Sequence, residues 1–242
     1  MTIQEQHFDF DIKIDKVSTE FRESFNVAHK DWLLNEAEQV LLNQRYGLNN
    51  NAKRGFEATQ KRIDDLSTLH IKYPNQPAIT PIQHDAGVWE VPLSSLSFPY
   101  LHYTRGTVEV TEEGCDPREV TISIIQNDDI IKSLRDPFRG SGDSEVLGNF
   151  GKSSIDDGPS LFLYSPASLT LDNVKLEYIK KPKRVNFGGY RYIDGVIYLT
   201  QNSEFPEHVH STIVDIAADI AAGIIENNNY SQLTTKKLFT KE

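Results

Sequence analysis

Two histidines stand one residue apart near the end of the 242-residue sequence, in the stretch FPEHVHSTIVDIAADIAAGIIE (205–226). His208 and His210 have carboxylates nearby, and imidazole and carboxylate groups are zinc ligands. One hypothesis is therefore a metal-dependent hydrolase that combines either histidine with Asp215 or Asp219. On a helix, however, two residues at this spacing point about 200° apart. We therefore predict a helix here, without a bound metal ion.

The same stretch has an unusually wide apolar face. At helical spacing its apolar arc covers well over half of the circumference, whereas a surface helix needs a stripe of only about 100°. We expect this helix to be covered from more than one side. His208 falls on a polar stripe, and His210 falls among small residues. The candidate assembly and packing residues at the centre of the arc are Val209, Ile213, Ile216, Ile220 and Ile224.

Other segments with reactive or charged residues do not predict a catalytic or ligand-binding site. Cys115 is the single cysteine and follows two glutamates, whose charge would disfavour the thiolate. The stretch GNFGKSS (148–154) ends like a phosphate-binding loop, but Val146 stands where the first glycine of that motif belongs. Asp64 and Asp65 would diverge on a helix, so we expect one to be solvated and the other capping or paired. The sequence predicts no catalytic, cofactor-binding or metal-binding residue.

The charge distribution limits the classes of partner. The formal net charge is −10, which disfavours general nucleic-acid binding because affinity for phosphate comes mainly from Lys and Arg. One dense basic cluster interrupts the acidic sequence, and it suits a solvated strand end or a contact with DNA phosphates or an acidic partner. The candidate DNA or partner contacts are Lys180, Lys181, Lys183 and Arg184.

The helices that must position these groups lie at both ends of the sequence. The alternating segment 8–14 predicts a short strand or an extended arm with one buried face. Helical spacing predicts a helix beginning after Asn26 as N-cap and ending at Gly47. A second helix is predicted over 52–71, and the short connection indicates a helical hairpin.

The centre of the sequence has a different character. Prolines and β-branched or aromatic runs from residue 73 onward predict strands, including 100–112 and 169–181. A short helix is expected over 127–136, capped by Asn127 or Asp128. The Gly/Ser/Asp-rich stretch 139–159 is predicted to be a long mobile loop, and Asp194-Gly195 predicts a hairpin turn.

Together these elements predict an α+β protein with a β-rich region inserted into a helical base. The base consists of the N-terminal helical hairpin and the C-terminal helix. The predicted organisation is one chain-spanning domain with an N-terminal arm and hairpin (1–72), a β-rich region (73–202), and a C-terminal packing helix and tail (203–242). The apolar stretches are too short and too interrupted to cross a bilayer, so no membrane contact is expected.

Several segments, in this order, resemble the ring proteins of crAss-like phages, which are head-to-tail connector (adaptor) proteins of short-tailed bacteriophages. They are WLLNEAEQVLLNQRYG, GFEATQKRIDDLSTL, DDIIKSLRDPF, EYIKKPKRVNFGGY and PEHVHSTIVDIAADIAAGIIE. The resemblance spans most of the sequence but is carried by collinear segments and not by a catalytic motif. The regions 85–120 and 139–170 contribute nothing to it.

This resemblance implies a structural virion protein without a cofactor. Its expected location is the portal or tail vertex, after synthesis in the host cytoplasm. The expected assembly is a ring of twelve copies that docks below the portal protein, extends the DNA channel and anchors further ring or tail proteins. Genomic DNA would pass close by without specific binding. A tail module that binds a host receptor is the remaining alternative, and the β-rich centre allows it.

Overall fold

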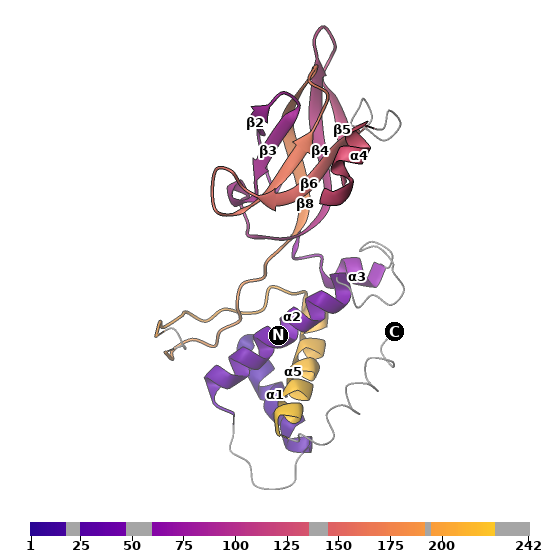
Figure 1. Cartoon of the computed structure of the whole chain (residues 1–242). Helices are drawn as coiled ribbons and strands as arrows, with labels where there is room; N and C mark the ends of the chain where they lie inside the picture. Colours follow the sequence, from indigo (N-terminus) through magenta and orange to yellow (C-terminus); the bar gives the residue numbers. More distant parts are fainter. Residues whose placement is uncertain (18–24, 47–59, 136–144, 192–194, 226–242) are drawn as a thin grey trace. The chain divides into compact units, whose positions relative to one another are not determined.

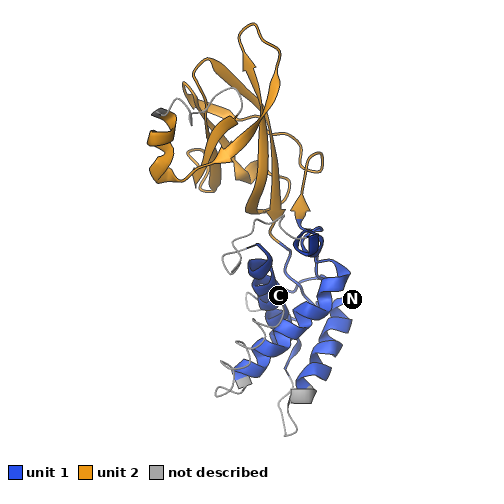
Figure 2. Ribbon diagram, turned by 90° about the vertical axis from the view of Figure 1, so that its right-hand side faces the viewer, with its two compact units in different colours: residues 1–69, 182–242 blue, residues 70–181 orange. Residues whose placement is uncertain are grey.

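The computed structural model describes residues 1–17, 25–46, 60–135, 145–191 and 195–225, and its fold is α+β. The chain divides into two compact units, shown in Figure 2. Unit 1 contains residues 1–69 and 182–242, and unit 2 contains residues 70–181. The β-rich region is therefore inserted into the helical base. The predicted second boundary at 202/203 differs from this division, because residues 182–202 belong with the helices.

Unit 1 is built on three long helices, labelled in Figure 1. They are α1 (Ile3–Val17), α2 (Val27–Tyr46) and α5 (His210–Ile225), which follows the 3-10 turn η4 (Glu207–Val209). Both α1 and α2 pack against α5. The apolar arc of α5 is wide because two helices cover it. No helix among the described residues is long and apolar enough to span a membrane.

Helix α1 replaces the strand or arm predicted over 8–14. Its start is a capping box, in which Thr2 N donates to Glu5 Oε2 at 2.7 Å and Glu5 N donates to Thr2 Oγ1 at 3.3 Å. Phe10 and Ile14 are buried, whereas Phe8 and Ile12 are exposed. The alternating pattern therefore combines an inward and an outward helical stripe, each with a spacing of four residues.

The structure confirms the start of the second predicted helical segment and changes the third. Helix α2 begins as predicted, since His29 N donates to Asn26 Oδ1 at 2.8 Å. The predicted stop at Gly47 and the hairpin connection lie outside the described residues. Of the helix predicted over 52–71, the described part retains α3 (Gln60–Asp65), whereas β1 (His70–Ile71) pairs with the last strand of the sheet. Pairing of Ile71 with Tyr178 replaces the last predicted helical turn.

Unit 2 is an eight-stranded sheet with the order β1-β8-β4-β5-β6-β7-β3-β2. The β5–β6 pair is parallel and every other neighbouring pair is antiparallel. The remaining strands are β2 (Ile82–Asp85), β3 (Val88–Pro92), β4 (Tyr100–Glu112), β5 (Arg118–Ile124), β6 (Glu145–Lys152), β7 (Pro159–Tyr164) and β8 (Leu169–Lys180). Strand β4 has the bounds expected from the sequence.

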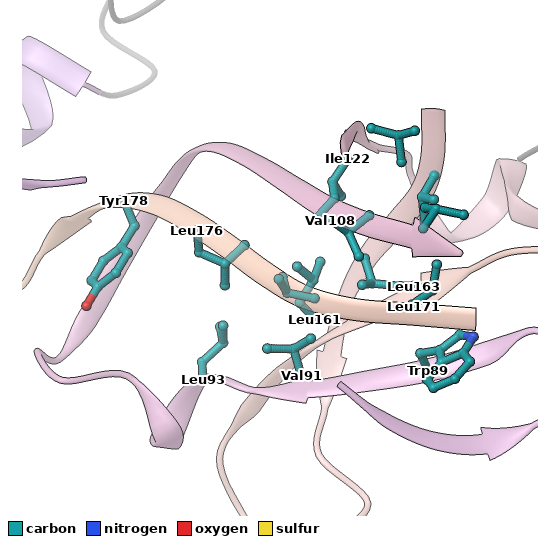
Figure 3. Close-up of a cluster of buried hydrophobic side chains, with 14 of the residues drawn as sticks. Trp89, Val91, Leu93, Val108, Ile122, Leu161, Leu163, Leu171, Leu176 and Tyr178 are labelled. Atoms are coloured by element: carbon teal, nitrogen blue, oxygen red, sulfur yellow. The ribbon is translucent and has the colours of Figure 1, made fainter. Parts of the chain in front are cut away.

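The core of unit 2 comes from alternate residues on these strands. Figure 3 shows side chains of several strands pointing toward one another, among them Val91, Leu161 and Leu176. In β8 the regular alternation of core-facing residues is interrupted at Asn173. This residue has a positive φ of 46° and lies beside a shift in the pairing register with β4. This irregularity lets Leu171 and Val174 both be buried although they are three residues apart.

Strand β6 contradicts the long loop predicted over 139–159. Residues 139–144 lie outside the described residues, but β6 lies between β5 and β7 and is largely buried. Its glycines suit this position, because a Cβ on Gly148 would lie 3.0 Å from Ile122 Cγ2. The composition indicated a loop because glycine in a strand interior is uncommon.

The predicted short helix also begins differently. The 3-10 turn η3 (Asn127–Asp129) precedes α4 (Ile130–Arg135), and a second 3-10 turn, η2 (Leu93–Ser95), follows β3. The Asn127 side chain does not cap this turn but accepts a hydrogen bond from the Asn149 side chain. Asn127 therefore ties the turn to β6.

Candidate assembly surface

The histidines in η4 and at the start of α5 contact different partners. His210 is buried, and its Nε2 donates to Phe205 O at 2.8 Å. His208 is on the exposed side, where its Nε2 lies 3.0 Å from Asp65 Oδ1. Among the residues that the structure describes, no group of three His, Cys, Asp or Glu side chains could hold a metal ion. The two imidazoles instead help to hold unit 1 together.

Asp64 and Asp65 take the separate roles expected of helical neighbours. Asp64 is exposed and accepts from Gln60 Nε2 at 2.8 Å. Asp65 is buried, and Arg45 Nε lies 2.7 Å from its Oδ2. Together with His208, this ion pair connects α3 to both α2 and η4, so the acidic pair is structural.

The predicted packing residues of α5 have different exposures. Val209 and Ile213 are buried inside the unit, Ile216 and Ile220 are half-buried, and Ile224 is 59% exposed. The centre of the buried face is shifted from the predicted arc, because Val214, Ala217 and Ala221 are also buried. The outer part of the stripe remains available for other contacts.

Residues 185–201, of which 192–194 are not described, form an arm whose attachment to α2 was not predicted from the sequence. Figure 1 draws it as two long traces running away from α2. Antiparallel bridges join Asn186 to Gln201 near the base of the arm and Arg191 to Ile197 farther along. At the base, Asn186 N donates to Gln201 O at 3.0 Å, and Gln201 N donates to Asn186 O at 2.7 Å. The predicted Asp194-Gly195 turn lies between Arg191 and Ile197, but Asp194 lies outside the described residues.

A polar face of α2 fixes the base of the arm. Asp31, Asn35 and Glu38 follow one another at spacings of four and three residues, which places them on one side of the helix. Asn35 Nδ2 donates to Val185 O, and Val185 N donates to Asn35 Oδ1, both at 2.8 Å. This pair of bonds holds the arm's first residue as a neighbouring strand would.

Asp31 is the most heavily bonded of the three. Its side chain is fully buried, and its Oδ2 accepts from Phe187 N at 2.8 Å and from the Tyr190 hydroxyl. Its Oδ1 lies 2.8 Å from His7 Nε2. The His7 ring also stacks on the Phe187 ring at a centroid distance of 5.1 Å. One carboxylate thus joins α1, α2 and the arm.

Glu38 holds the segment that follows the arm. Ser203 Oγ donates to Glu38 Oε1 at 2.5 Å. Burial raises the pKa of Glu38 to about 8, a rise that the Ser203 hydrogen bond opposes and the charge of Glu204 reinforces. A carboxyl group that is protonated in the folded state makes the stability of unit 1 depend on pH.

The pH dependence gives a testable prediction for unit 1. Because the folded-state pKa of Glu38 is raised, its stabilisation is complete below about pH 4.5 and is lost as the pH rises through about 8. We expect the free energy of unfolding of unit 1 to fall by about 3 kcal/mol between pH 5 and pH 8. Urea titrations followed by helical circular dichroism would measure this fall.

Glu38→Gln should remove most of this pH dependence. Glu36→Gln is the matched control, since Glu36 is exposed on the same helix. An equal slope in wild type and Glu38→Gln would show that Glu38 is not the group responsible.

The basic cluster lies on both sides of the boundary between the units. Lys180 and Lys181 end unit 2, where Lys180 Nζ lies 5.5 Å from the centre of the Phe98 ring. Lys183 and Arg184 lead into the arm and are exposed. Lys183 N donates to Glu204 Oε2 at 3.0 Å, which fixes the backbone, and the largely exposed ammonium group lies 3.8 Å from Glu204 Oε1.

Arg184 and Lys183 also line a groove beside the arm. Its volume is about 520 Å³, and Ile197 and Leu199 of the arm contribute apolar surface to it. Leu199 is 90% exposed and Ile197 is 62% exposed. Exposed apolar side chains with a polar rim are typical of protein interaction sites.

Unit 2 contains a second polar cluster, which resembles a catalytic triad but lacks its geometry. Glu90 is fully buried and accepts from Ser153, Ser154 and Ser160 hydroxyls at 2.6, 2.5 and 2.7 Å. His84 Nε2 lies 2.5 Å from Glu90 Oε2 and 3.1 Å from Ser154 Oγ. In a triad the two nitrogens of the histidine contact the acid and the serine separately. Here one nitrogen faces both groups.

The Glu90 cluster therefore has a structural role. Ser153 and Ser154 belong to the turn between β6 and β7, so Glu90 of β3 fixes that turn. Burial alone would raise the pKa of Glu90, but hydrogen bonds from the three serines and His84 lower it to about 2. The lysine of the phosphate-loop-like stretch, Lys152, ends β6, and its Nζ lies 2.8 Å from Asp157 Oδ1.

The arm combines a base bonded to α2 with exposed apolar side chains. The chain belongs to the phage tail ring protein 3/4 family, whose crAss-phage ring model matches residues 1–235. This match confirms the resemblance to the ring proteins of crAss-like phages. No curated protein matches the sequence. The chain is a phage tail ring structural protein, which implies a place in the virion and assembly with other tail proteins.

Proposed function

We propose that this protein is a subunit of the head-to-tail connector. In this role, copies of the chain form a ring of twelve that docks below the portal protein, extends the DNA channel and anchors the next ring or tail protein. The observation that carries the proposal is the family match, which spans both units and the arm. The proposed function is structural and requires no cofactor.

The charge of the chain supports a channel that does not bind DNA tightly. The net charge is −10, and a negative wall repels the phosphate backbone so that DNA can slide past it. We assign Lys183 and Arg184 to protein contacts and not to DNA readout, because they lie beside exposed apolar side chains in the groove. Interfaces with partner proteins combine such apolar centres with polar rims.

The composition of purified particles tests this proposed function. Virions separated from the lysate on a density gradient should contain this chain in a fixed ratio to the portal protein, in equal copy number if both form rings of twelve. Quantitative mass spectrometry measures that ratio. Detection of the chain in the infected cell but never in particles would refute a connector role.

A further inference from the structure

The arm presents apolar surface that its own unit leaves exposed. Ile197 and Leu199 are 62% and 90% exposed, although the arm's base is bonded to α2 through Asp31 and Asn35. A fixed base combined with an exposed apolar strip suits contact with another macromolecule better than it suits a mobile loop. Arg191 on the arm and Arg184, the residue just before it, are exposed and give it a basic rim.

A complementary surface exists on α1. Phe8 is 68% exposed and Ile12 is 38% exposed, and their spacing of four residues places them on one outward stripe. Glu5, Asp9 and Asp11 border this stripe. Asp9 pairs at 2.7 Å with Lys13, which also lies 3.3 Å from Asp215, and Asp11 pairs with Lys30 at 2.6 Å. Because four carboxylates share these two lysines or lie beside them, the border keeps an acidic excess, whereas the arm has a basic border.

A closed ring requires two different surfaces on each copy. In a cyclic assembly of more than two copies, each subunit uses one patch toward the next copy and another patch toward the previous copy. The arm and the outward stripe of α1 are two such patches with opposite charge, and complementary charge fixes the register of an interface. The outer stripe of α5, which ends at the exposed Ile224, is the rival acceptor.

We infer that the arm of one copy packs Ile197 and Leu199 against Phe8 and Ile12 on α1 of the neighbouring copy, with Arg184 and Arg191 near its acidic border. This inference rests on the proposed ring, and it names the surfaces that close the ring. Each copy donates its arm in one direction and offers its α1 stripe in the other.

Cysteine cross-linking in assembled particles tests the pairing. Cys115 is the single native cysteine and is exposed, so Cys115→Ser provides a background without thiols. Into this background we would place Leu199→Cys with Phe8→Cys, Leu199→Cys with Ile224→Cys for the rival acceptor, and Leu199→Cys with Ile131→Cys as control. Ile131 is 64% exposed and lies in unit 2.

Virions carrying each pair would be oxidised and run on non-reducing gels. We expect the Phe8 pair to give a ladder of covalently joined copies, and the single Leu199→Cys variant to remain monomeric. A ladder from the Ile224 pair without one from the Phe8 pair would overturn the assignment of the acceptor. Monomers from the Phe8 pair in virions that contain the chain would also overturn it, while absence of the chain from virions would refute the proposed function itself.

Discussion

Replacing Asp31 with Ala is expected to destabilise unit 1 by about 3 to 5 kcal/mol. The substitution leaves the Phe187 N–H, the Tyr190 hydroxyl and His7 without their shared acceptor inside the unit. Unsatisfied buried polar groups carry the full cost of desolvation. Chemical denaturation followed by helical circular dichroism measures the loss.

The same substitution should loosen the arm at Phe187 and Tyr190, although Asn35 still holds Val185, and weaken ring assembly under conditions in which unit 1 is still folded. Glu36→Ala is the control on the same helix, because Glu36 is exposed. Asp31→Asn keeps an acceptor for the Phe187 N–H and should cost less than Asp31→Ala. Equal stability of Asp31→Ala and Glu36→Ala would contradict the role given to this carboxylate.

The second large effect is expected at Glu90 in unit 2. Glu90→Ala removes the acceptor shared by three serine hydroxyls and His84, so we expect a loss of about 3 to 5 kcal/mol. The sequence has two tryptophans, and Trp89 is the buried one. In a Trp32→Phe background, tryptophan fluorescence therefore reports the unfolding of unit 2 alone.

Glu90→Ala should also change how the stability of unit 2 depends on pH in the acidic range. Because the folded-state pKa of Glu90 is lowered, its stabilisation is present above about pH 4.5 and is lost as the pH falls through about 2. This loss should reach about 3 kcal/mol in the wild type and disappear in Glu90→Ala. Glu113→Ala, at an exposed turn, should leave both stability and acid sensitivity unchanged. A wild-type acid response in Glu90→Ala would refute the explanation.

The predictable parts of the fold are those in which local pattern and tertiary packing agree. Asn26 caps α2 because its side chain bonds within the first turn of the helix, an interaction that needs no distant partner. Strand β4 was predicted with its observed bounds, since its β-branched and aromatic residues match its place beside β8. The α+β class followed from such elements.

The errors arose where one pattern has two physical explanations. Phe8, Phe10, Ile12 and Ile14 alternate as in a strand, but they form two opposite stripes of α1, and the Thr2–Glu5 capping box was the overlooked signal. The glycines of β6 indicate a loop by composition, yet in the sheet they accommodate large neighbours such as Ile122.

The candidate site depends on contacts between distant residues, which limited its prediction from sequence. The spacing of Asp31, Asn35 and Glu38 reveals a polar helical face among buried leucines, but it does not identify Val185, Phe187 and Ser203 as its partners. Likewise, Glu90 stands in an apolar strand, and its serine partners come from β7 and the turn before it. Such pairings follow from the complete fold and not from local sequence.

The central claim is that this chain forms a ring between the portal and the tail. A reconstruction of the virion's portal vertex by electron cryomicroscopy, into which the helical and sheet units are fitted separately, tests it most directly. We predict a closed twelve-fold ring of this chain between the portal and the next tail component. A vertex in which that density belongs to other chains, or particles in which this chain lies at the tail tip, would contradict the account.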